Sequence, residues 1–103
     1  MAIPIPVVPE TYDPATVELC SFHDAVPGFL EGSDTPRAYL ERCLDVIAAR
    51  EPSIKAFVVM DVEAARLAAD QSTERYNAGK PFSRTDGMPF AVKDLFKTTD
   101  FPT

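Results

Sequence analysis

The sequence predicts an α/β layered fold in which two short strands are joined through a helix. Two apolar runs, at residues 56–60 and 88–92, have the length of buried strands, and both contain β-branched residues. An alanine-rich segment at residues 62–76 separates them, and a helix that starts at Thr35-Pro36 precedes them. The order helix, helix, strand, helix, strand is typical of the opening of an α/β fold.

The first element is an extended arm followed by a short helix. Four prolines in the first fourteen residues favour polyproline or irregular backbone. Asp13 is a suitable N-cap and Pro14 suits the first helical turn, so we expect a short helix that runs to about His23. Pro27-Gly28 is expected to prevent this helix from continuing.

The helix that starts at Thr35-Pro36 has one apolar face. Its apolar residues recur at helical spacing: Leu40, Cys43, Leu44 and Ile47. We expect it to end at Arg50-Glu51, because the residue before Pro52 avoids helical geometry.

The alanine-rich helix has a start signal and a stop signal. Asp61 can cap its N-terminus, and Glu63 in the first turn interacts favourably with the helix dipole. Asn77-Ala78-Gly79 supplies the stop. A polar loop at residues 80–86 then leads to the second predicted strand.

The charge of the chain is unevenly distributed. The net charge is −6, and all of the excess lies in residues 1–34, which contain six acidic residues and no Lys or Arg. Residues 35–103 contain ten acidic and ten basic residues. An acidic chain without a basic cluster argues against direct binding of nucleic acid or of an anionic membrane. We therefore expect residues 1–34 to form an acidic, Pro-rich arm with a short helix, and residues 35–103 to form the beginning of a larger domain.

Targeting, membrane and metal-binding signals are weak. The N-terminus lacks the positive region of a signal peptide, and no stretch reaches transmembrane length, so we expect a cytoplasmic protein with no membrane partner. Cys20 and Cys43 have no metal-binding spacing, and His23 is the only histidine. The four glycines are scattered and form no phosphate-binding loop. No metal site and no cofactor are expected.

The strongest chemical signal is a lysine at the end of the second apolar run. Lys93 follows Gly87-Met88-Pro89-Phe90-Ala91-Val92 and precedes Asp94. On this pattern alone, a strand-end lysine beside an aspartate is most often a surface ion pair. A lysine amine that loses its solvation can, however, serve as a base.

The segment at residues 87–94, followed by Phe101-Pro102-Thr103, resembles the lysine-bearing segment of the amidase signature family. That family's pattern runs roughly Gly-(Ile/Val)-Pro-x-x-x-Lys-Asp and continues to a Pro-Thr step. The preceding order of elements is also similar to the family's N-terminal region, so the resemblance covers residues 30–103. Thr85-Asp86 depart from the family pattern, which often has Leu and a small residue or His there.

The resemblance implies a fold and a mechanism. The fold would be the N-terminal portion of the family's mixed β-sheet core with surrounding helices. Members hydrolyse carboxamide C–N bonds with a Ser-cisSer-Lys triad, and by matching position Lys93 would be the catalytic lysine. Both serines of the triad would come from sequence beyond Thr103, so we expect residues 1–103 alone to be inactive. The expected partners are the remaining C-terminal part of the amidase and a small-molecule amide substrate, whose binding residues are not identified.

Two alternatives remain open. The chain could be a noncatalytic interaction protein derived from an amidase, which binds a partner through the acidic, Pro-rich arm and the helix that contains Leu40 to Ile47. It could also be the N-terminal piece of the A-type subunit of a glutamyl-tRNA(Gln) amidotransferase, because such subunits share the lysine motif.

Overall fold

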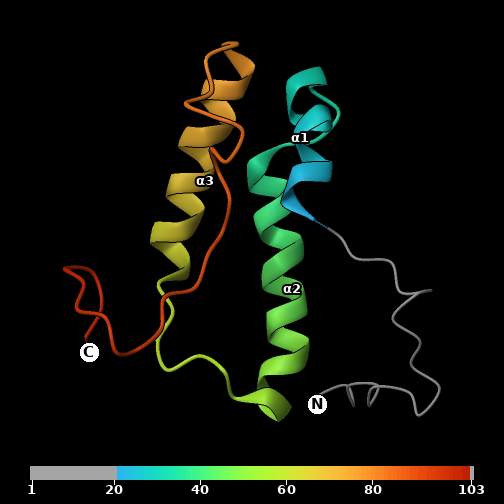
Figure 1. The fold of residues 1–103 in the computed structure, drawn as a ribbon. Helices are drawn as coiled ribbons and strands as arrows, with labels where there is room; N and C mark the ends of the chain where they lie inside the picture. Colours follow the sequence, from blue (N-terminus) through green and yellow to red (C-terminus); the bar gives the residue numbers. More distant parts are fainter. Residues whose placement is uncertain (1–20, 103) are drawn as a thin grey trace.

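Three helices and their connecting loops make up the described part of the chain. The structure is a computed structural model, and it describes residues 21–102. The helices are α1 (Phe22–Glu31), α2 (Pro36–Ile54) and α3 (Val62–Asn77). α2 packs along α3, and the shorter α1 contacts α3 near one end of this pair (Figure 1).

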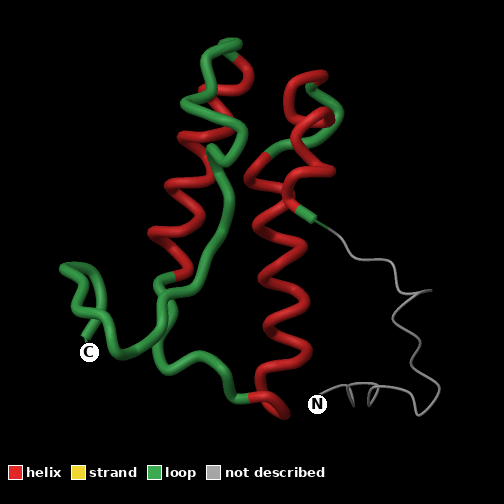
Figure 2. The backbone as a smooth tube through the Cα atoms, in the orientation of Figure 1, coloured by secondary structure: helices red, strands yellow, loops and turns green. Residues whose placement is uncertain are grey.

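The predicted α/β fold is wrong for residues 21–102, where the structure contains helices and loops but no strand (Figure 2). Residues 56–60 and 88–92, the two expected strands, lie in loops, and their apolar side chains are largely exposed: Val58 is 80% exposed and Phe90 is 81% exposed. A strand is held by hydrogen bonds to a neighbouring strand. Within the described residues neither run has such a partner, and an apolar run by itself does not specify one.

The first helix differs from the expected one. α1 begins after Ser21, whose hydroxyl accepts a hydrogen bond from the Asp24 amide at 3.2 Å, and it continues through Pro27 to Glu31. Phe22, Val26 and Phe29 are buried on one face at helical spacing, and we attribute the tolerance of Pro27 to this burial. The expected arm and the start of the expected helix at Asp13-Pro14 lie outside the described residues.

The starts of the other two helices are confirmed. The Thr35 hydroxyl accepts a hydrogen bond from the Ala38 amide at 3.0 Å, and Asp61 caps α3 in the same way at 3.0 Å through the Ala64 amide. The stop of α3 is also confirmed, since the helix ends at Asn77.

The predicted end of α2 is wrong by one turn, because the helix continues through Pro52 to Ile54. Lys55 then adopts the left-handed conformation, with φ of 53°, and its amide bonds to the Glu51 carbonyl. The Glu51 carboxylate also accepts hydrogen bonds from the amides of Ala56 and Phe57, at 2.6 and 2.7 Å. The Lys55 amide pairs one of the carbonyls that a helix end leaves free, and the Glu51 carboxylate pairs two amides of the loop that follows. Together these bonds stabilise a last turn that lies beyond the proline.

The core is a small aromatic cluster between α1 and α3. It consists of Phe22, Val26, Phe29 and Tyr76, with Tyr39 of α2 packed against it. The rings of Phe29 and Tyr76 lie 5.3 Å apart in an edge-to-face arrangement, which aromatic pairs favour. This cluster fixes the C-terminal end of α3, from which the loop to the lysine segment departs.

Salt bridges join α2 to α3 outside this core. Glu41 accepts hydrogen bonds from Arg37 and Arg66, and Arg37 also pairs with Asp70 at 2.6 Å. The two arginines, Arg66 first, lower the pKa of the Glu41 carboxyl below its usual value. The side chains of these ion pairs are half exposed, so each pair contributes little to the stability of the contact between α2 and α3.

Candidate catalytic-lysine segment

The loop that precedes the lysine segment is fixed to α3 by a buried ion pair. Asp86 has a side chain that is only 2% exposed, and Arg75 of α3 contacts both of its carboxylate oxygens. Arg75 Nε lies 2.8 Å from Oδ2 and Nη2 lies 2.6 Å from Oδ1, which is the bidentate geometry that an arginine and a carboxylate favour. The Phe82 amide donates a third hydrogen bond, to Oδ2, at 2.9 Å.

These contacts hold Asp86 in its charged form. The Arg75 guanidinium, assisted by the Phe82 amide, lowers the pKa of the Asp86 carboxyl from 3.8 to about 2, although burial acts in the opposite direction. Ser72 of α3 is fully buried and contributes to the lowered pKa of this carboxyl, but its hydroxyl makes no well-formed hydrogen bond with any described residue. Arg75 is therefore the main cause of the stabilised negative charge.

The backbone of Asp86 is held as well. The buried Tyr76 hydroxyl donates a hydrogen bond to the Asp86 carbonyl at 3.1 Å. Burial, reinforced by the neighbouring Asp86 charge, raises the pKa of Tyr76, so the phenol keeps the proton that it donates. On the outer side, the Arg75 guanidinium lies 4.1 Å from the centre of the Phe82 ring, which stacks on it. Arg75 and Tyr76, two consecutive residues of α3, therefore bind the side chain and the backbone of Asp86.

Gly87, the first residue of the family motif, fits a space that a larger residue would not. Its φ is +87°, which residues with a side chain rarely adopt. A Cβ atom built on Gly87 would lie 2.5 Å from the Ser72 hydroxyl oxygen and 2.8 Å from the Pro36 Cβ atom. The chain therefore passes close to α3 and to the start of α2 at Gly87, where a residue with a Cβ atom would not fit.

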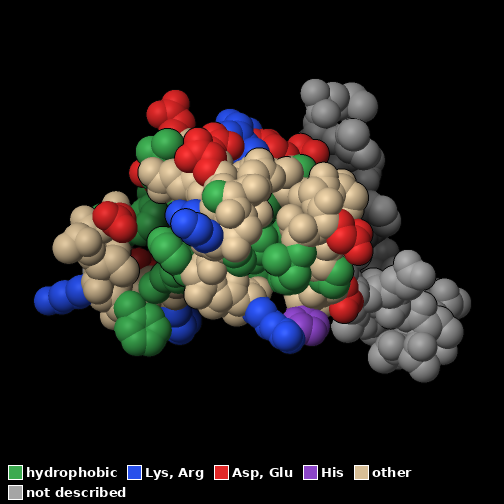
Figure 3. Space-filling view, turned by 90° about the horizontal axis from the view of Figure 1, so that it is seen from above, with side chains coloured by type: hydrophobic (Ala, Val, Ile, Leu, Met, Phe, Trp, Pro, Cys, Tyr) green, Lys and Arg blue, Asp and Glu red, His purple; other side chains and the backbone are tan. Residues whose placement is uncertain are grey.

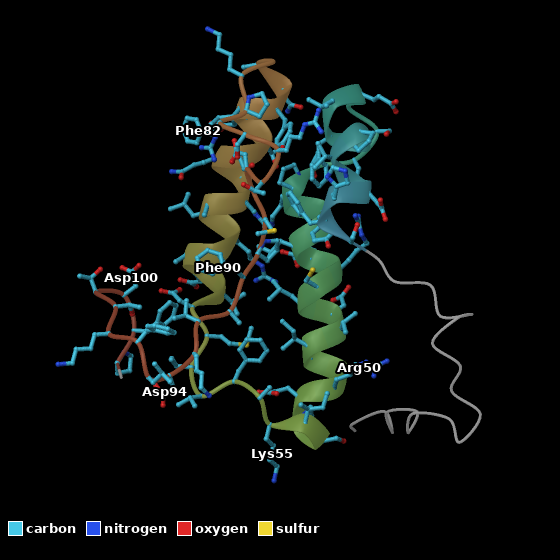
Figure 4. The ribbon with its side chains drawn as sticks, viewed as in Figure 1. Arg50, Lys55, Phe82, Phe90, Asp94 and Asp100 are labelled. Atoms are coloured by element: carbon cyan, nitrogen blue, oxygen red, sulfur yellow. The ribbon has the colours of Figure 1, made fainter. Side chains whose placement is uncertain are left out.

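The chain then returns along the bundle, in the direction opposite to that of α3, toward the C-terminal end of α2 (Figure 1). Phe90 lies on this returning segment, and Asp94 lies toward the same end of the molecule as Lys55 (Figure 4). Lys93 is exposed, and its carbonyl accepts a hydrogen bond from the Phe96 amide at 3.1 Å, which closes a turn. The structure thus places Lys93 just before a turn on an exposed segment.

The segment around Lys93 exposes several large apolar side chains. Four large apolar side chains on it are at least 47% exposed: Phe90, Val92, Leu95 and Phe96. In the view of Figure 3, apolar side chains reach the surface between charged ones. A desolvated environment for the Lys93 amine is not formed by the described residues, and it would require further protein around this segment.

The other residues considered in the sequence do not gather at this segment. His23 is exposed in the first turn of α1. Cys43 is half-buried in α2, where burial raises the pKa of its thiol. Cys20 lies outside the described residues. Among residues 21–102, no group of three or more His, Cys, Asp or Glu side chains is arranged to hold a metal ion.

Sequence reasoning missed the pairing of Arg75 with Asp86. It noted Asp86 only as a departure from the family pattern, and Arg75 not at all. The one available signal was the Asp-Gly dipeptide, which is typical of a turn. Nothing in the spacing of the two residues indicates that they meet.

A comparison with models of known protein families identifies the family of the chain. The model described as Amidase matches residues 38–103, which include α2, α3, the Arg75–Asp86 pair and Lys93. The chain belongs to the amidase family.

Curated proteins that resemble this chain include the A-type subunits of glutamyl-tRNA(Gln) amidotransferases. The one from Corynebacterium glutamicum is 44% identical over 70 residues, which is 67% of this chain and 14% of that protein. The one from Chloroflexus aggregans is 43% identical over 63 residues, 61% of the chain and 13% of that protein. The human mitochondrial one is 30% identical over 83 residues, 81% of the chain and 16% of that protein.

The chain therefore aligns with only 13 to 16% of the length of these relatives. The comparison with solved structures found no significant match. None of the helices within residues 21–102 has the length and apolarity needed to cross a membrane.

Proposed function

We propose that this chain is the N-terminal part of an enzyme that hydrolyses carboxamide C–N bonds, and that Lys93 is its catalytic base. The observation that carries the proposal is the family match, which runs through Lys93 and its flanking residues. The structure supports it with a specific conformation at Gly87, the residue with which the lysine motif begins.

The chemistry that the family resemblance implies is acyl transfer through a Ser-cisSer-Lys triad. The neutral Lys93 amine accepts a proton from the bridging serine, which in turn activates the nucleophilic serine. The nucleophile attacks the amide carbonyl, the leaving amine or ammonia takes up the proton that the triad removed from the nucleophile, and water then releases the acid from the acyl-enzyme. An oxyanion hole of backbone N–H groups stabilises the tetrahedral intermediates.

Both serines and the oxyanion hole are proposed to lie C-terminal to Thr103. An exposed amine in water is protonated at neutral pH, and it becomes a base only when other protein removes its solvation. We therefore propose that residues 1–103 alone are inactive, and that the rest of the enzyme covers the apolar side chains around Lys93. The proposed location is cytoplasmic, with a small-molecule amide as substrate, without cofactor, and without direct contact with nucleic acid or membrane.

A second candidate has a specific observation in its favour. The relatives described above are all named as A-type subunits of glutamyl-tRNA(Gln) amidotransferases. On this alternative, the amide hydrolysed is that of glutamine, and the ammonia passes to a second reaction in a partner subunit.

The test compares two lysines of the same segment in the full-length polypeptide. Lys93→Ala is expected to lower the rate of amine or ammonia release from carboxamides by about 10²-fold or more, the usual range for loss of a general base. Lys97→Ala, four residues further along the same exposed segment, is the control and is expected to retain the wild-type rate.

The outcomes separate the alternatives. Near-normal turnover in Lys93→Ala would remove the proposed role of this lysine. Glutamine-dependent ammonia release that requires a partner subunit would select the amidotransferase. If the full-length wild-type polypeptide hydrolyses no amide, alone or with a partner subunit, the noncatalytic interaction protein is the correct description.

A further inference from the structure

The chain that leads from α3 to Lys93 is attached to the helices at two places, the end of α3 and Asp86-Gly87. Upstream, the end of α3 is closed by bonds from the amides of Gly79 and Lys80 to the carbonyls of Tyr76 and Arg75. The polar loop then makes a second attachment at Asp86 and Gly87, and beyond it residues 90–100 are all exposed.

This second attachment has more contacts than any other position in the loop. The Asp86 carboxylate receives two hydrogen bonds from Arg75 and one from the Phe82 amide, and the Asp86 carbonyl receives one from Tyr76. Gly87 adds a steric constraint, because Ser72 and Pro36 leave no space for a Cβ atom. A charged carboxylate this deeply buried requires its partner, since an unpaired buried charge is strongly unfavourable.

We propose that Arg75, Asp86 and Gly87 form an anchor that positions Lys93, so that Arg75 and Asp86 are positioning residues for the reaction. This inference rests on the proposed function of Lys93. Neither residue touches the reacting atoms: they act by fixing the point from which the lysine segment departs.

The length of the chain gives the size of the effect. Lys93 lies six residues beyond Gly87, so a fixed Gly87 confines it to within about 21 Å of that point, at ~3.5 Å per residue. Without the anchor, the nearest fixed backbone is Lys80 at the end of α3, and the tether lengthens to thirteen residues. The local concentration of a tethered group falls as roughly the −3/2 power of tether length, which gives a loss of about threefold. Loss of exact orientation raises this toward the ~10²-fold that a misplacement of about 1 Å can cost.

The experiment uses Asp86→Asn in the full-length polypeptide, with Asp34→Asn as a matched control. Asp34 also has a two-pronged pair with an arginine, Arg42, at 3.1 and 2.7 Å, but it lies between α1 and α2, and its other hydrogen bonds are to Gly28 and Thr35. Two quantities are measured: hydrogen exchange of the amides in residues 80–88, and kcat and KM for amide hydrolysis by the folded fraction.

The expected result for Asp86→Asn is at least tenfold faster exchange in residues 80–88, together with a kcat lowered by about 3- to 10²-fold and little change in KM. Asp34→Asn is expected to change neither. If Asp86→Asn does not fold, Arg75→Lys replaces it, because it keeps the positive charge but loses the two-pronged geometry.

Two outcomes overturn the inference. One is unchanged exchange in residues 80–88, which would show that the ion pair does not hold the loop. The other is faster exchange with an unchanged kcat, which would show that the loop does not position Lys93. A failure of the proposed function appears differently, as normal turnover in Lys93→Ala, while hydrogen exchange still reports on the anchor itself.

Discussion

Gly87→Ala is expected to destabilise the chain more than an ordinary glycine substitution does. Two costs combine at this position. The first is the positive φ of +87°, which costs a residue with a Cβ about 1–2 kcal/mol. The second is the contact of the new Cβ with the Ser72 oxygen at 2.5 Å and the Pro36 Cβ at 2.8 Å, and overpacking of this kind costs about 1–3 kcal/mol. The sum is about 2–5 kcal/mol.

The chain offers a matched control in Gly79→Ala. Gly79 also has a positive φ, of +71°, but a Cβ there would meet nothing within 4 Å. This variant is expected to lose only the conformational term, about 1–2 kcal/mol. The difference between the two variants therefore isolates the steric contribution of the contact with Ser72 and Pro36.

The assay is urea unfolding followed by far-ultraviolet circular dichroism, with the free energy of unfolding compared among wild type, Gly87→Ala and Gly79→Ala. Adding Ser72→Ala to Gly87→Ala removes the hydroxyl oxygen at 2.5 Å and is expected to recover part of the loss. The reasoning is refuted if Gly87→Ala and Gly79→Ala lose the same free energy within about 0.5 kcal/mol.

Three further outcomes follow from the packing and the charges. Phe29→Ala, which empties the centre of the aromatic cluster, is expected to cost about 3–5 kcal/mol of unfolding free energy in the same urea assay, and a loss below about 1 kcal/mol would contradict the core as described. Lys55→Gly is expected to stabilise the chain by up to about 1 kcal/mol, measured as a rise in melting temperature, because Lys55 holds a φ of 53° that glycine adopts without strain. Because the folded-state pKa of Asp86 is depressed from 3.8 to about 2, its contribution is fully present above about pH 4 and is lost as the pH falls toward 2. That contribution is about 2 kcal/mol, and Asp86→Asn should flatten the fall in stability across this pH range, whereas an unchanged slope would refute the assignment.

The sequence predicts the local signals of this structure well. Thr35 and Asp61 are found as caps because a hydroxyl or carboxylate oxygen at that position satisfies an amide of its own first turn. The end of α3 is found because its signal is also local. Such features depend on residues within one turn of each other.

The features that depend on distant partners are predicted poorly. Pro27 and Pro52 both suggest the end of a helix, yet the helix continues past each of them. In α1 the residues around Pro27 form a buried face, and in α2 the residues that follow Pro52 bond to Glu51. The apolar runs at residues 56–60 and 88–92 favour strands, yet a strand needs a partner that the run itself does not encode.

The candidate site also contains one feature that depends on neighbouring residues and one that depends on residues distant in the sequence. Lys93 is recognisable from a contiguous motif, and the family match through it is confirmed. The anchor is not recognisable, because Arg75 and Asp86 meet only when the loop at residues 80–86 folds back on α3. The predicted division of the chain between residues 34 and 35 stays a prediction.

The most direct test of the account is the formation of an acyl-enzyme by the full-length polypeptide. A carboxamide substrate is mixed with wild type, Lys93→Ala or Lys97→Ala, the reaction is quenched at short times, and the covalent adduct is measured by mass spectrometry. The account predicts that wild type and Lys97→Ala form the adduct at the same rate and that Lys93→Ala forms it about 10²-fold or more slowly. Formation of the adduct by Lys93→Ala at the wild-type rate would contradict the account.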